Sequence, residues 1–211
     1  MAHRELTLPL VLASASPRRA ELLAQIGLAF TALPSHVPEP PPLPGDDLLA
    51  WAQHAALEKA RMTAELLPAD PALVLGADTV VVLPTERPVA PLLHGQPVTV
   101  LGKPRDAAEA TTMLTTLSGR AHAVISAFAL VHHPSGEAIT DVVETQVFFR
   151  RLSAEEIAAY VASGEPLDKA GAYGIQGFGA VLVDRIEGDY FTVVGLPLAR
   201  VWQRLAPWLA G

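Results

Sequence analysis

The stretch that decides the fold is LPLVLASASPRRAELLAQIG, residues 8–27. Its first part, residues 8–13, is apolar and predicts a buried strand. Ser16 then predicts a helix N-cap, whose hydroxyl would accept a hydrogen bond from an early backbone N–H, and Pro17 suits the first helical position. The chain is therefore expected to begin with a strand that leads directly into a helix over residues 17–26.

Two arginines occupy the first turn of this predicted helix. Arg18 and Arg19 lie at the positive end of the helix dipole, where each cation costs about 0.3–1 kcal/mol. A bound phosphate would reverse this effect, because free N–H groups and forked guanidinium groups both bind phosphate oxygens. Ser14 adds a hydroxyl just before the helix. The pattern predicts a phosphate site, with a solvated basic turn as the alternative, and the lack of a Walker lysine excludes a P-loop.

The composition excludes several classes of protein. The 211 residues suffice for one domain, and a chain that is 50% hydrophobic and 18% charged is globular. Without cysteine it has no disulfides or thiolate metal sites, which fits a reducing, cytoplasmic location. The apolar run near the start is too short for a membrane span. The formal net charge of −7 argues against a nucleic-acid partner, so an anion site must concentrate its cations locally.

The remaining sequence predicts alternating helices and strands, and then a cluster of strands. Helices are expected over residues 48–67, 106–119 and 153–164 and from Pro197 onward, the second and third opened by capping boxes. Strands are expected over residues 72–75, 79–83, 98–101, 121–132, 140–150, 180–186 and 190–194. The proline-rich stretches 34–44 and 84–97 are expected to be loops. This order predicts a single α/β domain with a mixed sheet.

An acidic residue interrupts the apolar run LVLGADTVVVL, residues 73–83. Burying the Asp78 carboxylate without a partner is costly, so a functional Asp78 needs cations, hydrogen-bond donors or a metal. The alternative is a bulge or turn over residues 76–78 in which Asp78 caps its own backbone.

Two lysines and a glycine-rich segment are further candidates. Lys103, in VLGKPRD, follows an apolar run and would point at a phosphate or, alternatively, into solvent. Lys59 lies on a predicted helix beside other charges, where a solvated face is the simpler interpretation. The segment around Gln176 is rich in glycine, which allows close approach to a ligand, and the amide can read a nucleobase edge. Tyr173 and Phe178 could stack on a base or belong to the core.

Taken together, these residues resemble the Maf family of nucleoside triphosphate pyrophosphatases. The resemblance rests on LASASPRRAELL, GADTVV, LGKPRD, LSGRAHAVIS and DKAGAYGIQGFGAVLVDRIEGDYFTVVGLPL, in that order over residues 12–198. It implies a Maf/ITPase-like α/β fold over residues 1–211, an elongated mixed sheet flanked by helices, with a cleft between two lobes. It also implies hydrolysis between the α- and β-phosphates with Mg²⁺ or Mn²⁺, and a homodimer. DKAGAYGIQG resembles the dTTP/UTP branch.

The resemblance assigns roles to matching positions. Asp78 matches the proton acceptor. The positions associated with substrate choice are Arg18, Thr79 and Gln176, and those around the phosphates are Ser14, Arg19, Lys59 and Lys103.

One stretch departs from the family pattern. The family has a pair of acidic residues after the first helix, whereas residues 35–42 here read SHVPEPPP. If the first acid is a metal ligand, either Glu39 takes its role or that role is lost, and Asp78 and Glu39 are the predicted metal-site residues. The alternatives are a pyrophosphatase for 7-methyl-GTP or other modified nucleotides, and a noncatalytic nucleotide-binding regulator of cell division.

Overall fold

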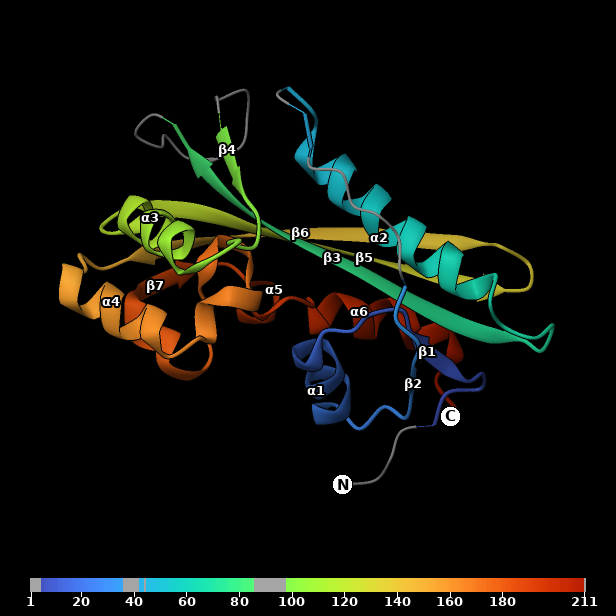
Figure 1. Ribbon diagram of the computed structural model, residues 1–211. Helices are drawn as coiled ribbons and strands as arrows, with labels where there is room; N and C mark the ends of the chain where they lie inside the picture. Colours follow the sequence, from blue (N-terminus) through green and yellow to red (C-terminus); the bar gives the residue numbers. More distant parts are fainter. Residues whose placement is uncertain (1–4, 36–41, 44, 86–97, 211) are drawn as a thin grey trace.

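A single mixed sheet runs the length of the molecule, with helices on both of its faces (Figure 1). The computed structural model describes residues 5–35, 42–43, 45–85 and 98–210. The strands are β1 (Leu10–Leu12), β2 (Thr31–Ala32), β3 (Ala72–Pro84), β4 (Val98–Leu101), β5 (Ala121–His133), β6 (Ala138–Phe149) and β7 (Val183–Glu187). The α-helices are α1 (Pro17–Gln25), α2 (Leu48–Ala64), α3 (Ala107–Leu117), α4 (Ala154–Ala162), α5 (Tyr190–Val194) and α6 (Leu198–Leu205). The 3₁₀ segments are η1 (Glu165–Asp168), η2 (Ala170–Ala172), η3 (Gly177–Leu182) and η4 (Ala206–Trp208).

The sheet combines parallel and antiparallel pairs, as predicted. Its order is β2-β1-β3-β5-β6-β7, with β4 also paired to β3. The central strand β5 is antiparallel to both of its neighbours, β3 and β6, and β1 runs parallel to both β2 and β3. The sequence prediction of an α/β domain with a mixed sheet is therefore confirmed.

The run around Asp78 is one continuous strand, and the prediction of two strand halves is wrong. β3 pairs with β5 without a break, from Ala72 opposite His133 to Val82 opposite Ala123. This long antiparallel ladder holds residues 76–78 in extended backbone, so Asp78 lies in mid-strand and caps no turn.

The other edge of β3 is interrupted, and this interruption determines where the site forms. β1 pairs with residues 73–75, and β4 pairs with residues 81–84. Because β5 occupies the opposite edge throughout, β1 and β4 must share this one. Residues 76–80 therefore have no strand beside them here within the described part of the chain, and their backbone groups on this edge need other partners.

Helix α2 lies unusually close to the sheet because the contact is made by small residues. The side chains of Ala52, Ala56 and Ala60 are fully buried against one face of the sheet. At the closest point, a Cβ added to Gly76 would lie 2.2 Å from the Ala56 carbonyl oxygen and 2.8 Å from the Ala60 nitrogen. Only glycine fits at this position without moving the helix.

The opposite face of the sheet carries two separate packed clusters. Toward one end, Leu73 and Leu75 pack with side chains of α1 and α6, and toward the other, Val81 packs with side chains of α3 and α4. Figure 1 shows α2 on one side of the long strands and α1 and α6 on the other.

Several local predictions need correction. Residues 190–194 form helix α5, because the Asp189 carboxylate accepts from Thr192 N at 2.7 Å and caps a helical turn despite the β-branched residues. The strand predicted from residue 180 begins at residue 183, after η3. Ser16 precedes α1 as predicted, but its hydroxyl makes no capping bond.

The two predicted capping boxes differ in outcome. The box of Ser153 and Glu156 is complete. In the other, Asp106 accepts from Glu109 N, but the Glu109 carboxylate accepts from Arg105 N at 2.7 Å instead of the N-cap N–H, so only half of the box forms.

Some predictions fall outside the described residues. These are Glu39, most of the first proline-rich stretch (residues 36–41 and 44) and most of the second (residues 86–97). In the described parts of the chain, no helix has both the length and the apolar character needed to cross a bilayer.

The close contact at Gly76 generates a prediction about stability. Gly76→Ala should lower the free energy of unfolding by about 1–3 kcal/mol, because the added methyl overpacks the α2 contact. Gly102→Ala is the matched control, since a Cβ there would meet nothing within 4 Å. Chemical denaturation of both variants measures the difference, and equal effects would contradict the packing argument.

Candidate active site

A cavity of about 430 Å³ opens beside the interrupted edge of β3. It brings together residues from α1, α2, β3 and the segments that follow β1, β4 and η2. Every predicted site residue that the structure describes lines it, namely Ser14, Arg18, Arg19, Lys59, Asp78, Thr79, Lys103 and Gln176. Glu39, the remaining one, lies outside the described residues.

The centre of the site is a buried ion pair between α2 and β3. Lys59 Nζ lies 2.6 Å from Asp78 Oδ1, and the two residues are 7% and 4% exposed. The close α2 contact at Gly76 places Lys59 within reach of the strand. The simpler interpretation of the local sequence, a solvated face, is therefore wrong for Lys59, whereas the role around the phosphates that the resemblance implies stays a prediction. Removing one partner of such a pair typically costs about 3–5 kcal/mol, because the other charge is left buried.

The second oxygen of Asp78 is available to bind a ligand. Asp78 Oδ2 is buried and has no hydrogen-bond partner among the described residues. A carboxylate oxygen without a donor is destabilising unless a ligand completes it. Water or a divalent cation would satisfy it, and Mg²⁺ typically binds through one or two carboxylates together with substrate phosphates. Asp78 thus fits a shared metal–phosphate site, while no group of three or more acidic or histidine residues in the described ranges forms a metal cage.

Arg19 holds the interrupted edge of the sheet together. Its guanidinium donates to Ala77 O at 2.8 Å, to Ser14 Oγ at 3.1 Å and to Thr79 Oγ1 at 3.1 Å, and its Nε donates to Gly195 O at 3.0 Å. Where no strand of the described residues pairs with this edge of β3, the Arg19 side chain donates to the Ala77 carbonyl. Arg19 therefore fixes the positions of Ser14 and Thr79, two other predicted site residues.

Arg18 lies at the mouth of the cavity in a chain of ion pairs. Its Nη1 is 3.2 Å from Asp168 Oδ2, and Lys169 Nζ is 2.7 Å from Asp168 Oδ1. Burial tends to raise the pKa of Asp168, but the Lys169 ammonium and the Arg18 guanidinium hold it below its ordinary value. Asp168 is thus a carboxylate that orients two cations.

Two of the predicted residues present side chains with no partner in the described part of the protein. Neither the Lys103 ammonium nor the Gln176 amide forms a hydrogen bond or ion pair there, and both line the cavity. Each can therefore bind a ligand without first breaking a contact with a described residue.

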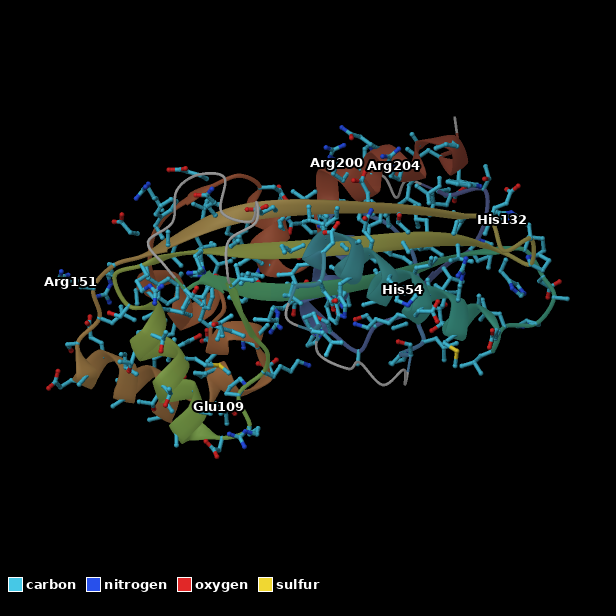
Figure 2. All side chains as sticks on the ribbon, turned by 90° about the horizontal axis from the view of Figure 1, so that it is seen from above. His54, Glu109, His132, Arg151, Arg200 and Arg204 are labelled. Carbon is cyan, nitrogen blue, oxygen red and sulfur yellow. The ribbon has the colours of Figure 1, made fainter. Side chains whose placement is uncertain are left out.

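The charges around the cavity are opposite in sign to the charge of the chain. Five cationic side chains and two carboxylates line it, a surplus of three positive charges, although the formal net charge is −7. Figure 2 shows Arg151 near one end of the molecule and Arg200 and Arg204 together on α6. None of the three lines the cavity, and Arg204 pairs with Asp141 at 2.9 Å. The cavity is therefore built for an anion with several charges, such as a polyphosphate.

The two candidate aromatic residues have different positions. Tyr173 lines the cavity, is 5% exposed, and its hydroxyl lies 2.7 Å from His122 Nε2. Burial lowers the pKa of His122 to about 3, so this histidine is a neutral partner that fixes the tyrosine ring. Phe178 is 50% exposed and does not line the cavity.

Ser35 and Lys169 also line the cavity, and sequence reasoning assigned neither of them to the site. Lys169 directly follows Asp168 in the glycine-rich segment, and this proximity was the available signal. Ser35 lies in a proline-rich loop and carries no local signal.

Comparison with known proteins agrees with this geometry. A family model described as Maf-like protein matches residues 9–208. A curated dTTP/UTP pyrophosphatase of Moorella thermoacetica is 52% identical over 202 residues, which cover 93% of each chain. Proteins of the same name from Syntrophotalea carbinolica and Koribacter versatilis are 45% and 44% identical. These alignments cover 93% and 97% of this chain, and 83% and 97% of the relatives.

Both the extent of the family match and the identity to these relatives exceed what a shared fold alone produces. The chain belongs to the Maf family.

Proposed function

We propose that the protein is a nucleoside triphosphate pyrophosphatase that hydrolyses dTTP and UTP to the monophosphate and pyrophosphate. The observation that carries the proposal is the cation-rich cavity around Asp78, whose Oδ2 has no described partner. The names of the curated relatives support the nucleotide class.

The triphosphate would lie between the start of α1 and Lys103. Ser16 makes no side-chain cap, so N–H groups at the start of α1 remain available to phosphate oxygens. Arg18 and Lys103 would bind the outer phosphates, while Arg19 holds Ser14 and Thr79 in place beside them. This arrangement neutralises the charge that develops on the leaving pyrophosphate.

Asp78 would orient the attacking water and accept its proton. Oδ1 is fixed by Lys59, which leaves Oδ2 as the atom that can accept a hydrogen bond from water. Attack on the α-phosphorus forms the new P–O bond as the bond to the bridging oxygen of pyrophosphate breaks, and the proton passes to Asp78. Lys59 contributes positive charge beside the reacting phosphate.

A divalent cation is part of the proposal, with Asp78 as its described ligand and Glu39 as the predicted second one. When bound, Mg²⁺ or Mn²⁺ would neutralise phosphate charge and align the leaving group. The unpartnered Oδ2 of Asp78 supports this assignment.

Gln176 would read the base. Its amide is unpartnered among the described residues and lines the same cavity as Asp78, and Tyr173 supplies a rigid aromatic wall beside it. An amide offers both a donor and an acceptor, which matches the edge of a pyrimidine.

The proposal also includes a homodimer in the cytoplasm, with residues 1–211 acting as one domain of two lobes around the cavity. The two packed clusters on one face of the sheet support the two lobes, and the lack of cysteine is compatible with a reducing compartment.

A panel of nucleotides tests the proposed function. With Mg²⁺ or Mn²⁺, we expect dTTP and UTP to yield monophosphate and pyrophosphate faster than CTP, ATP, GTP or 7-methyl-GTP, as measured by chromatography of both products. Faster turnover of 7-methyl-GTP than of dTTP and UTP would show that the substrate is a modified nucleotide instead. Nucleotide binding without turnover would favour a regulator.

Asp78→Asn tests the proton acceptor. We expect kcat on the preferred nucleotide to fall by about 100- to 10,000-fold, because the amide cannot accept the proton. Calorimetry should still detect nucleotide binding, and circular dichroism reports whether the variant folds. The control is Asp70→Asn at an exposed position. Pyrophosphate release near the wild-type rate would refute the assignment.

Gln176→Ala tests base reading. We expect the preference for UTP and dTTP over other nucleotides to weaken by about tenfold, because a polar contact to the base is lost. The kcat on the favoured substrate should change little. Gln203→Ala on the exposed side of α6 serves as the control. An equal loss on every nucleotide would count against base reading.

A further inference from the structure

We infer that Glu165, together with Tyr160, is a positioning residue that fixes the loop of residues 174–179, here called the Gln176 loop. By fixing this loop, Glu165 would set nucleotide selectivity. The inference rests on the proposed function and deepens it. Glu165 does not line the cavity, so it would act only through the loop.

The Glu165 carboxylate accepts hydrogen bonds from one side chain of α4 and from two backbone N–H groups of the loop. One oxygen, Oε1, accepts from Tyr160 Oη at 2.9 Å and from Gly179 N at 3.1 Å. The other, Oε2, accepts from Phe178 N at 3.1 Å. Two consecutive backbone N–H groups therefore bind one carboxylate, which closes the loop on its C-terminal side.

Tyr160 closes the loop on the other side. Its hydroxyl, besides donating to Glu165, accepts from Gly174 N at 3.2 Å. The hydrogen-bonded path thus runs from Gly174 through Tyr160 and Glu165 to Gly179. Gln176 lies between these two anchors, and its own side chain forms no bond that would hold it in the described part of the chain.

The backbone of the loop packs closely around the side chains of Tyr160 and Glu165. Gly177 has φ +66°, and a Cβ there would lie 3.0 Å from Glu165 Oε2. A Cβ on Gly179 would lie 2.2 Å from Gly174 O and 2.6 Å from the Tyr160 hydroxyl oxygen. The two ends of the loop therefore touch, and its geometry depends on the groups in its centre.

The site requires a carboxylate rather than an amide. Three donors converge on two acceptor oxygens, whereas glutamine has one acceptor oxygen and an NH₂ group that would face a backbone N–H. Burial raises the pKa of Tyr160, which keeps its hydroxyl protonated and able to donate. Tyr160→Phe removes only the hydroxyl and keeps the buried ring, so it is the milder test of the same network.

The test compares Glu165→Gln with wild type and with Glu137→Gln, an exposed control in the β5–β6 turn. The readouts are kcat and KM for UTP, dTTP and CTP. For Glu165→Gln we expect the KM for UTP to rise and the UTP-over-CTP ratio of kcat/KM to fall by about tenfold, with kcat on UTP within about twofold. Tyr160→Phe should shift the same ratio in the same direction by a smaller factor.

A double variant separates positioning from a general loss of structure. In Glu165→Gln/Gln176→Ala, selectivity should be no lower than in Gln176→Ala alone, because both changes remove the same contact. Additive losses, unchanged selectivity in Glu165→Gln and Tyr160→Phe, or an equal fall in kcat on all three nucleotides would each overturn the inference while leaving the proposed function intact. If wild type and Glu137→Gln both fail to hydrolyse UTP and dTTP, the proposed function fails first.

Discussion

The interrupted edge of β3 is the constraint on which the rest of the site depends. Between β1 and β4 the strand loses its neighbour, and the Ala77 carbonyl is satisfied by Arg19 at 2.8 Å and approached by Lys59 at 3.5 Å. Backbone groups that a strand would have paired thus draw cationic side chains from α1 and α2 to the same place. Arg19 and Lys59, two of the five cationic residues that line the cavity, contact this unpaired edge.

The ion pair of Lys59 and Asp78 depends on packing that carries no charge. Alanines on α2 and Gly76 on β3 let the helix approach the sheet closely, so that a helical lysine reaches a carboxylate in mid-strand. One oxygen of Asp78 is used in this contact and the other is left without a described partner. Because the pair is buried, water cannot replace a lost contact of either charge. Loss of the ion pair and the lack of a described partner for the second oxygen are therefore both costly in free energy.

The two ends of the cavity are organised by different means. At the phosphate end, Arg18 and Lys169 are held by Asp168, and Arg19 is held by backbone carbonyls and hydroxyls. At the Gln176 end, a neutral tyrosine and a carboxylate hold a glycine-rich loop by its N–H groups. Positive charge is thereby concentrated where an anion would bind, while the loop presents an uncharged amide.

The sequence by itself determined the local elements and the identity of the candidate residues. Cap residues and apolar spacing placed α1 and α4, β-branched runs placed β5 and β6, and the motifs named the residues that line the cavity. Only the tertiary structure decided that residues 72–84 form one strand, that residues 190–194 form a helix, and that Lys59 is buried. The physical reason is that β3 and the burial of Lys59 depend on partners distant in the chain, namely the β5 ladder and the close approach of α2 at Gly76. Helix α5 combines a local cap from Asp189 with a distant contact, in which Ser126 Oγ on β5 donates to Thr192 O.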